Sequence, residues 1–105
     1  MINIIFVCGK NKWRSRTAEA TYKNNSRVNV RSAGIRSNAK RKISIKDIEW
    51  ADLILVMENK YKKWIKQNFK CLHFPPINSL EIPDTYNFMD DELIELIKIG
   101  TEQYL

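Results

Sequence analysis

Apolar residues along this chain occur in two patterns, short unbroken runs and stripes that recur every three or four positions. The runs are rich in β-branched residues and are typical of strands buried on both faces of a parallel sheet. They cover residues 2–7 and 53–57. The alternating segment 28–33 and the short segment 77–82 are predicted to be two further strands. The stripes predict helices near residues 15–24, 44–50 and 59–69, and a last helix that starts at Asp90.

Capping signals support two of these helix starts. Residues 44–47, with the sequence Ser-Ile-Lys-Asp, form a variant of the capping box. Asp90 is suited to an N-cap, and the two acidic residues after it are favourable at the positive end of a helix dipole. Pro83 is expected to stop the fourth strand.

Strands alternate with helices along the whole chain, which predicts an α/β fold in a single domain, residues 1–105. We expect three layers, with a four-stranded parallel sheet and helices on both of its faces. Ligands of such sheets bind beyond the carboxyl ends of the strands. Cys8 follows the first strand and Asp84 follows the fourth, so both side chains are expected at this edge of the sheet.

Basic residues are concentrated in the first three quarters of the chain. Residues 1–80 contain 17 Lys and Arg against 5 acidic residues, whereas residues 81–105 contain 1 basic and 7 acidic residues. The positive charge of residues 1–80 favours an anionic partner, such as a phosphate ester or a nucleic acid. Many of the lysines are also expected simply to be solvated.

Several classes of protein are excluded. No apolar run approaches the length that spans a bilayer, and no basic segment precedes an apolar one at the N-terminus, so we expect a cytoplasmic protein without a membrane partner. Two cysteines, Cys8 and Cys71, cannot form a disulfide framework and should be free thiols. The single His73 has no metal-binding cluster around it, which argues against a zinc site. We expect no cofactor.

The segment between the first strand and the first helix carries the clearest chemistry. It consists of Cys8, Gly9, Lys10, Asn11, Lys12, Trp13, Arg14 and Ser15. A thiol facing a helix N-terminus lies where anions bind and where a thiolate is stabilised. Arg14 adds a planar, permanently charged fork that fits phosphate, and Ser15 can donate a hydrogen bond to the thiolate. The segment therefore predicts nucleophilic attack on phosphorus, with the phosphate oxygens held by backbone N–H groups and Arg14.

A phosphate ester also needs a proton for its leaving oxygen, and Asp84 is the candidate donor. It would act as a general acid, and then as a general base toward water. Tyr86, two residues further on, would form a wall of the pocket. An Asp after Pro is also common in turns, so this assignment depends on the presence of Cys8.

The two motifs together resemble those of the low-molecular-weight protein tyrosine phosphatase family. The segments Ser32-Ala33-Gly34 and 51–57 also match that family, in the same order along the chain. The resemblance covers most of the chain and implies a flavodoxin-like α/β fold. It implies a phosphatase that hydrolyses a phosphomonoester, of phosphotyrosine or another anionic compound, through a cysteinyl-phosphate intermediate.

The resemblance also implies a role for each motif residue. Cys8 would be the nucleophile, Arg14 the phosphate clamp and Asp84 the acid and base, while Asn11 would brace the loop and Ser15 would assist the thiolate. The substrate-binding residues expected in addition are Gly9, Lys10, Asn11, Lys12, Trp13 and Tyr86.

The chain departs from the family pattern at several positions of the loop. Lys10 stands where the family usually has a glycine on a bend. Trp13 stands where it has a second cysteine, so no neighbouring thiol can protect Cys8 as a disulfide. Arg16 replaces a proline and places a cation at the unfavourable end of the helix dipole. The chain is also shorter between residues 34 and 51, where the family builds a substrate wall, so specificity is not implied.

Basic residues are expected to surround the mouth in place of that wall. They are Lys10, Lys12, Arg16, Arg36, Lys40, Arg41 and Lys42. This charge predicts a substrate with several negative charges, such as a nucleotide, a nucleic acid end or an acidic phosphopeptide, with Trp13 stacked on its ring. Trp13 packed beneath the first helix, with solvated lysines around it, is an equal alternative.

Two other functions stay open. An arsenate reductase uses a related loop, but it needs further thiols to pass electrons along, and only Cys71 is available. A phosphate- or RNA-binding module without catalysis would account for the basic surface. Such a binder, however, has no need for the thiol and the acid together.

Overall fold

The computed structural model describes residues 1–70 and 73–105, and strands and helices alternate along them as the sequence predicts. The elements are β1 (Ile2–Cys8), α1 (Arg14–Tyr22), β2 (Val28–Gly34), α2 (Ile45–Trp50), β3 (Leu53–Val56), α3 (Asn59–Asn68), β4 (Ile77–Ser79) and α4 (Asp91–Glu102).

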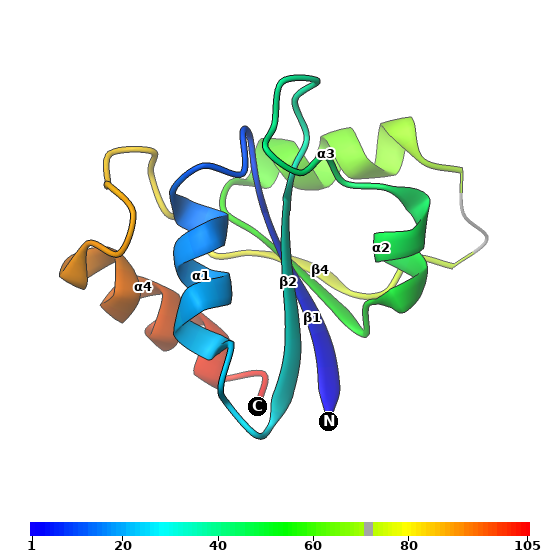
Figure 1. Ribbon diagram of the computed structural model, residues 1–105. Helices are drawn as coiled ribbons and strands as arrows, with labels where there is room; N and C mark the ends of the chain where they lie inside the picture. The colour runs from blue at the N-terminus through cyan, green and yellow to red at the C-terminus, as the bar shows by residue number, and fades with distance from the viewer. Residues whose placement is uncertain (71–72) are drawn as a thin grey trace.

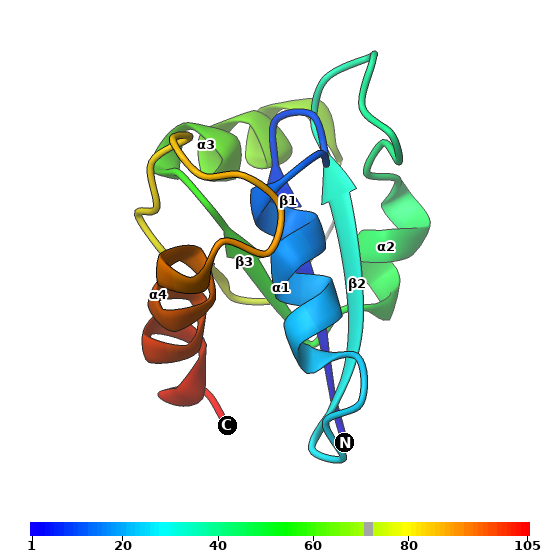
Figure 2. The same cartoon turned by 60° about the vertical axis from the view of Figure 1, so that its left-hand side comes forward.

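The four strands form one parallel sheet in the order β2-β1-β3-β4. The chain moves outward from β1 to β2 and then returns past β1 to β3 and β4. Because parallel crossovers are right-handed, this change of direction places α1 on one face and α2 and α3 on the other. Figures 1 and 2 show α4 returning to the face of α1. The predicted three-layer α/β fold is confirmed.

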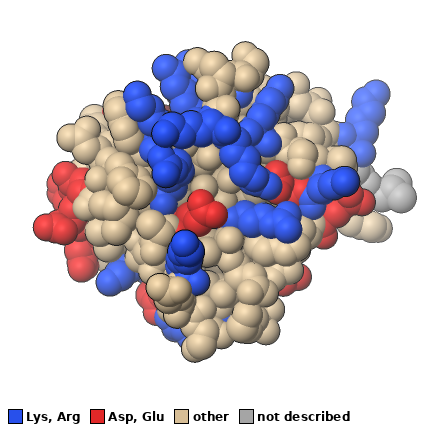
Figure 3. All heavy atoms as spheres, viewed as in Figure 1, with Lys and Arg blue, Asp and Glu red and all other residues tan. Residues whose placement is uncertain are grey.

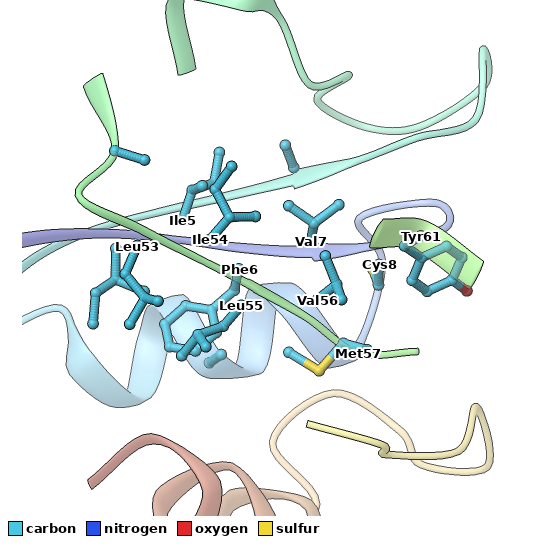
Figure 4. Close-up of a cluster of buried hydrophobic side chains, with 14 of the residues drawn as sticks. Ile5, Phe6, Val7, Cys8, Leu53, Ile54, Leu55, Val56, Met57 and Tyr61 are labelled. Atoms are coloured by element: carbon cyan, nitrogen blue, oxygen red, sulfur yellow. The ribbon is translucent and has the colours of Figure 1, made fainter. Parts of the chain in front are cut away.

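The core lies around the two central strands, β1 and β3. Residues Ile4–Cys8 and Leu53–Met57 are all buried, as expected for strands with a helix layer on each side. Figure 4 shows these side chains projecting to both sides of the sheet, with Cys8 at the end of the β1 row. The buried side chains of β1 and β3 therefore fix the position of Cys8 at the carboxyl end of β1 relative to the neighbouring strands.

Both predicted helix caps are present. Ser44 and Asp47 form the capping box of α2, in which the Ser44 backbone N–H donates to Asp47 Oδ2 at 3.0 Å. Asp90 Oδ1 accepts hydrogen bonds from the backbone N–H groups of Glu92 and Leu93 at 2.9 and 3.3 Å. These contacts satisfy helix N–H groups that would otherwise lack partners.

The fourth strand is shorter than predicted, because it ends at Ser79 rather than at residue 82. The backbone at Glu81 has φ 53°, which interrupts the extended conformation. Ile82 N–H still donates to the Met57 carbonyl at 2.9 Å, so the segment stays attached to β3. Asp84 therefore lies on an irregular segment that follows the end of β4.

The carboxyl ends of the strands lie at the upper edge of the sheet in Figures 1 and 2, and both chain termini lie at the opposite end. Gly34, the last residue of β2, closely approaches the loop after β1. A Cβ at this position would lie 2.6 Å from the carbonyl oxygen of Gly9, so only glycine fits. Within residues 1–70 and 73–105, no helix combines the length and the apolar character of a membrane-crossing segment.

Candidate active site

Residues 9–13 connect β1 to α1 in a tight loop whose carbonyl groups are engaged by the segment after β2. The carbonyl oxygens of Cys8, Gly9 and Lys10 accept hydrogen bonds from the backbone N–H groups of Ile35, Arg36 and Lys40, at 3.1, 2.9 and 3.0 Å. Within the described part of the chain, the N–H groups of residues 9–13 have no acceptor. Unpaired N–H groups in succession, next to a helix N-terminus, form an anion-binding concavity.

Asn11 holds this loop in shape. Its backbone adopts the left-handed conformation, with φ 54°, which asparagine tolerates better than most residues. Its side-chain Nδ2 donates to Ser15 Oγ at 2.8 Å and to Ser32 Oγ at 3.0 Å. The bracing position expected for Asn11 is therefore observed. Lys10, which stands where the family usually has a glycine, does not have a positive φ, because the left-handed conformation falls on Asn11 instead.

The thiol of Cys8 lies at the base of the loop, with only 3% of the residue exposed. Its Sγ lies 2.9 Å from Ser15 Oγ. Because Ser15 Oγ already accepts a hydrogen bond from Asn11 Nδ2, its own hydroxyl hydrogen is available to point toward the sulfur. Ser32 donates in turn to Glu19 Oε1 at 2.6 Å, which leaves its oxygen as the second acceptor for Asn11. The network orients Ser15 as a hydrogen-bond donor to the sulfur.

Arg14 is buried, with 3% exposed, and its guanidinium is held by three groups from distant segments. Nη1 donates to Glu58 Oε2 at 2.6 Å and to the Ile82 carbonyl at 2.7 Å, and Nη2 donates to Tyr61 Oη at 3.0 Å. Nε forms an ion pair with Asp84 Oδ1 at 3.5 Å. Of the five guanidinium N–H groups, one on Nε and one on Nη2 have no hydrogen-bond partner among the described residues. These two N–H groups can donate to two oxygens of one phosphate.

Glu58 and Tyr61 are site residues that the sequence analysis missed. Burial alone would raise the pKa of Glu58, but the hydrogen bond and the charge of Arg14 bring this pKa below its usual value. Burial alone would lower the pKa of Arg14, and the hydrogen bond to Glu58 raises it above its usual value. The pair is therefore charged near neutral pH, and it fixes the guanidinium in place.

A signal for these two residues existed in the sequence. Glu58 follows β3 at the same edge of the sheet where Cys8 follows β1, so the argument that selected Asp84 applied to it as well. Tyr61 belongs to the apolar stripe that predicts the helix at residues 59–69. Its ring is indeed buried, but its hydroxyl donates to Glu58 Oε2 at 3.1 Å and lies at the loop. Figure 4 shows the ring beside Cys8.

A cavity of about 200 Å³ opens over the loop. Its lining residues are Cys8, Gly9, Lys10, Lys12, Trp13, Arg14, Arg36, Tyr61 and Asp84. Asp84 is 60% exposed at its mouth, and Trp13 is 36% exposed. Trp13 thus lines the cavity, as predicted for a ring at its mouth.

Several residues expected at the mouth lie elsewhere. Tyr86 does not line the cavity and packs half-buried against the core. Arg16 lies over the ring of Phe88, and Arg41 binds the Ser32 carbonyl and the Asp47 carboxylate. Of the expected basic ring, Lys10, Lys12 and Arg36 line the cavity, and Lys40 and Lys42 do not. Cys71 lies outside the described residues.

Comparison with known proteins identifies the fold. No family model and no curated protein matches the sequence. Among solved structures, a mutant of YwlE from Bacillus subtilis has a TM-score of 0.70 and 25% identity, and the match covers the whole of both chains. The arginine phosphatase YwlE, in a cysteine-to-serine variant with a phosphorylated active-site serine, has a TM-score of 0.74 and 25% identity over 98% of this chain and 96% of its own.

A third neighbour is a low-molecular-weight phosphotyrosine phosphatase from Vibrio cholerae O395, VcLMWPTP-2. It has a TM-score of 0.80 at 17% identity, over 99% of this chain and 94% of its own, and it supports the fold alone. The chain has the fold of the low-molecular-weight phosphatases. It resembles their protein tyrosine phosphatase family along its entire length, which confirms the resemblance predicted from the sequence.

Proposed function

We propose that this protein is a cysteine-dependent phosphatase. The observation that carries the proposal is the convergence of Cys8, Arg14 and Asp84 on one cavity, beside a loop with unpaired N–H groups. The phosphatase neighbours support it, above all the arginine phosphatase variant in which the serine that replaces a cysteine carries the phosphoryl group. The sequence and the fold thus favour the same chemistry at the same strand end.

In the first step the Cys8 thiolate attacks phosphorus, the S–P bond forms and the P–O bond to the leaving group breaks. The N–H groups of residues 9–13 and the two available N–H groups of Arg14 hold the non-bridging oxygens, where charge is spread in the transition state. Asp84, at the mouth of the cavity, donates its proton to the leaving oxygen.

In the second step water attacks the phosphorus of the cysteinyl phosphate. Asp84, now a carboxylate, accepts a proton from this water, the S–P bond breaks and inorganic phosphate leaves. The sulfur departs as a thiolate, and the Ser15 hydroxyl, 2.9 Å away, donates to it. Since no electrons are exchanged, the cycle needs no thiol other than Cys8.

The arsenate reductase alternative is not favoured. The neighbours described above are phosphatases, and Trp13 occupies the loop position at which a second thiol would be useful. Within the described part of the chain, Cys8 is the single cysteine that lines the cavity.

The proposal is tested with p-nitrophenyl phosphate, phosphotyrosine and an alkyl phosphate, which contain the P–O bond that the mechanism breaks, and with phosphoarginine, in which a P–N bond would break instead. Wild type should turn over at least one of them, and Cys8→Ser should abolish this turnover while circular dichroism shows an unchanged fold. Asp84→Asn should slow hydrolysis of an alkyl phosphate far more than that of p-nitrophenyl phosphate, whose leaving group needs little protonation. Full activity of Cys8→Ser would end the proposal.

A further inference from the structure

A shallow hollow lies next to the candidate active site and shares one residue with it. Its lining residues are Ile35, Arg36, Ser37, Asn38, Lys42 and Trp64, from the segment after β2 and from α3. Arg36 lines both this hollow and the cavity above Cys8. A ligand that fills the cavity and extends past Arg36 therefore enters the hollow directly.

The surface between the hollow and the cavity above Cys8 is basic, and most of its charged side chains form no ion pair. Lys10, Lys12, Arg36 and Lys42 form no salt bridge with any residue in the described ranges. The hollow has no acidic lining residue, and the cavity has one, Asp84. Figure 3 shows Lys and Arg side chains gathered over the upper part of the face, where Figure 1 places the loops after β1 and β2.

This charge exceeds what one phosphate group needs. The charge of Arg14 is already balanced by Glu58 at 2.6 Å. When Asp84 is protonated as the general acid, Lys10 and Lys12 offset the two charges of the phosphate dianion in the cavity, which leaves Arg36 and Lys42 for a second anionic group. The substrate is therefore expected to carry negative charge beyond the phosphate that is cleaved.

Aromatic rings distinguish between the possible polyanions. The cavity and the hollow are each lined by a tryptophan and by cations. Trp13 is 36% exposed, with Lys12 Nζ 4.7 Å from its ring centroid, and the half-buried Trp64 lines the hollow together with Lys42. An accessible aromatic ring beside cations is typical of surfaces that bind single-stranded nucleic acid, because a base stacks on the ring while the backbone meets the charges. An acidic peptide would need the cations alone.

We propose that the phosphatase acts on the phosphorylated end of a single-stranded nucleic acid. This inference rests on the proposed function and names its substrate class. The terminal phosphomonoester enters the cavity above Cys8, the end base stacks on Trp13, and the next phosphodiester binds Arg36 and Lys42. Hydrolysis breaks the P–O bond of the terminal phosphate alone, and releases inorganic phosphate and a strand with a hydroxyl end.

The test compares three substrates of the wild-type protein: p-nitrophenyl phosphate, a pentathymidylate with a terminal phosphate, and an acidic phosphotyrosyl peptide. We expect the highest kcat/KM for the oligonucleotide. Its logarithm should fall with the logarithm of salt concentration, with a slope of about −0.7 for each phosphate contact. Lys42→Ala should reduce this slope by about 0.7, whereas Lys98→Ala, an equal charge change on α4, should leave it unchanged.

Base stacking is tested separately at Trp13. Trp13→Ala should lower the ratio of kcat/KM for the oligonucleotide to that for p-nitrophenyl phosphate by about fivefold or more, and Trp13→Phe should restore most of it, because one stacked base contributes at least ~1 kcal/mol. The ratio removes any general effect of the substitution on the loop.

The outcomes separate the two proposals. Absence of Cys8-dependent turnover of all three substrates would overturn the proposed function itself. Turnover of p-nitrophenyl phosphate with no preference for the oligonucleotide, or with an unchanged salt slope in Lys42→Ala, would overturn the nucleic acid inference alone. A phosphopeptide preferred over the oligonucleotide would also overturn it and would assign the basic surface to acidic proteins.

Discussion

The substitution Glu58→Gln tests whether the structure holds Arg14 as described. Glu58 Oε2 accepts from Arg14 Nη1 at 2.6 Å and from the hydroxyl of Tyr61 at 3.1 Å. Glutamine has nearly the same size and keeps a carbonyl acceptor, so the substitution removes the negative charge with little change of packing. The guanidinium of Arg14, 3% exposed, then loses its nearest counter-charge.

The expected loss follows from the exposure of the two groups. A hydrogen bond to a charged group contributes about 1.5–3 kcal/mol, and removing one partner of a buried ion pair costs up to about 5 kcal/mol. Glu58 is 30% exposed, so solvent screens part of the attraction, and the glutamine carbonyl retains one acceptor. We therefore expect the free energy of unfolding to fall by about 1–2 kcal/mol at pH 7.

The pH dependence of the difference in unfolding free energy shows whether the charge of Glu58 causes it. The pKa of Glu58 is lower in the folded protein than its usual value, near 4.3 in an unfolded chain. The stabilisation by the carboxylate is therefore fully present above about pH 4.3, and it is lost as the pH falls through the lower, folded-state pKa. Urea unfolding of wild type and Glu58→Gln should show a difference that is constant from pH 7 to pH 5 and shrinks below pH 4.

A control at a solvent-exposed carboxylate makes this test specific. Glu95→Gln on α4 should change the free energy of unfolding by less than about 0.5 kcal/mol at every pH. If Glu58→Gln and wild type differ by less than 0.5 kcal/mol at pH 7, or by the same amount at pH 7 and below pH 4, the ion pair does not stabilise the fold and the reasoning is refuted.

Three further predictions concern the loop, the thiol and the last helix. Gly34→Ala should lower kcat at least about tenfold and the free energy of unfolding by about 1–3 kcal/mol, because its Cβ would lie 2.6 Å from the Gly9 carbonyl oxygen; wild-type kinetics would contradict the close approach. Ser15→Ala should lower kcat about tenfold or more by removing the donor to the Cys8 sulfur, and a change below twofold in stopped-flow turnover would argue against that role. Asp90→Ala should lower the free energy of unfolding in urea by about 1 kcal/mol at unchanged kcat/KM, and an unchanged urea midpoint would contradict the cap.

The sequence predicted the order of the elements because the local signals agree with the fold. The runs at 2–7 and 53–57 are apolar on both sides of the strand, which only a sheet covered on both faces accommodates. The capping box at Ser44 and the cap at Asp90 are likewise contacts within one turn of chain, so they depend on neighbouring residues alone. The predicted length of β4 was wrong. Pro83 predicts a strand that reaches residue 82, but the positive φ at Glu81 ends the extended conformation earlier and gives no signal in the sequence.

In the candidate site, too, the features that depend on neighbouring residues could be predicted, and those that depend on distant segments could not. Residues 8–15 could be recognised because one short segment contains the thiol, the arginine and the loop between them. Which other side chains meet them depends on pairs far apart in sequence. Glu58 and Tyr61 reach Arg14 from α3 and its N-terminal end, while Tyr86, two residues from Asp84, packs half-buried against the core instead.

The sequence by itself therefore determined the α/β fold, the family resemblance and the loop at the end of β1, because periodicity and short motifs are local properties of the chain. The tertiary structure decided how the loop is held and what surrounds it. It placed the left-handed backbone at Asn11, the anchor of Arg14 on Glu58, and Trp13 on the wall of the cavity. Those positions follow from the register of the parallel strands, which brings segments distant in sequence to one edge of the sheet.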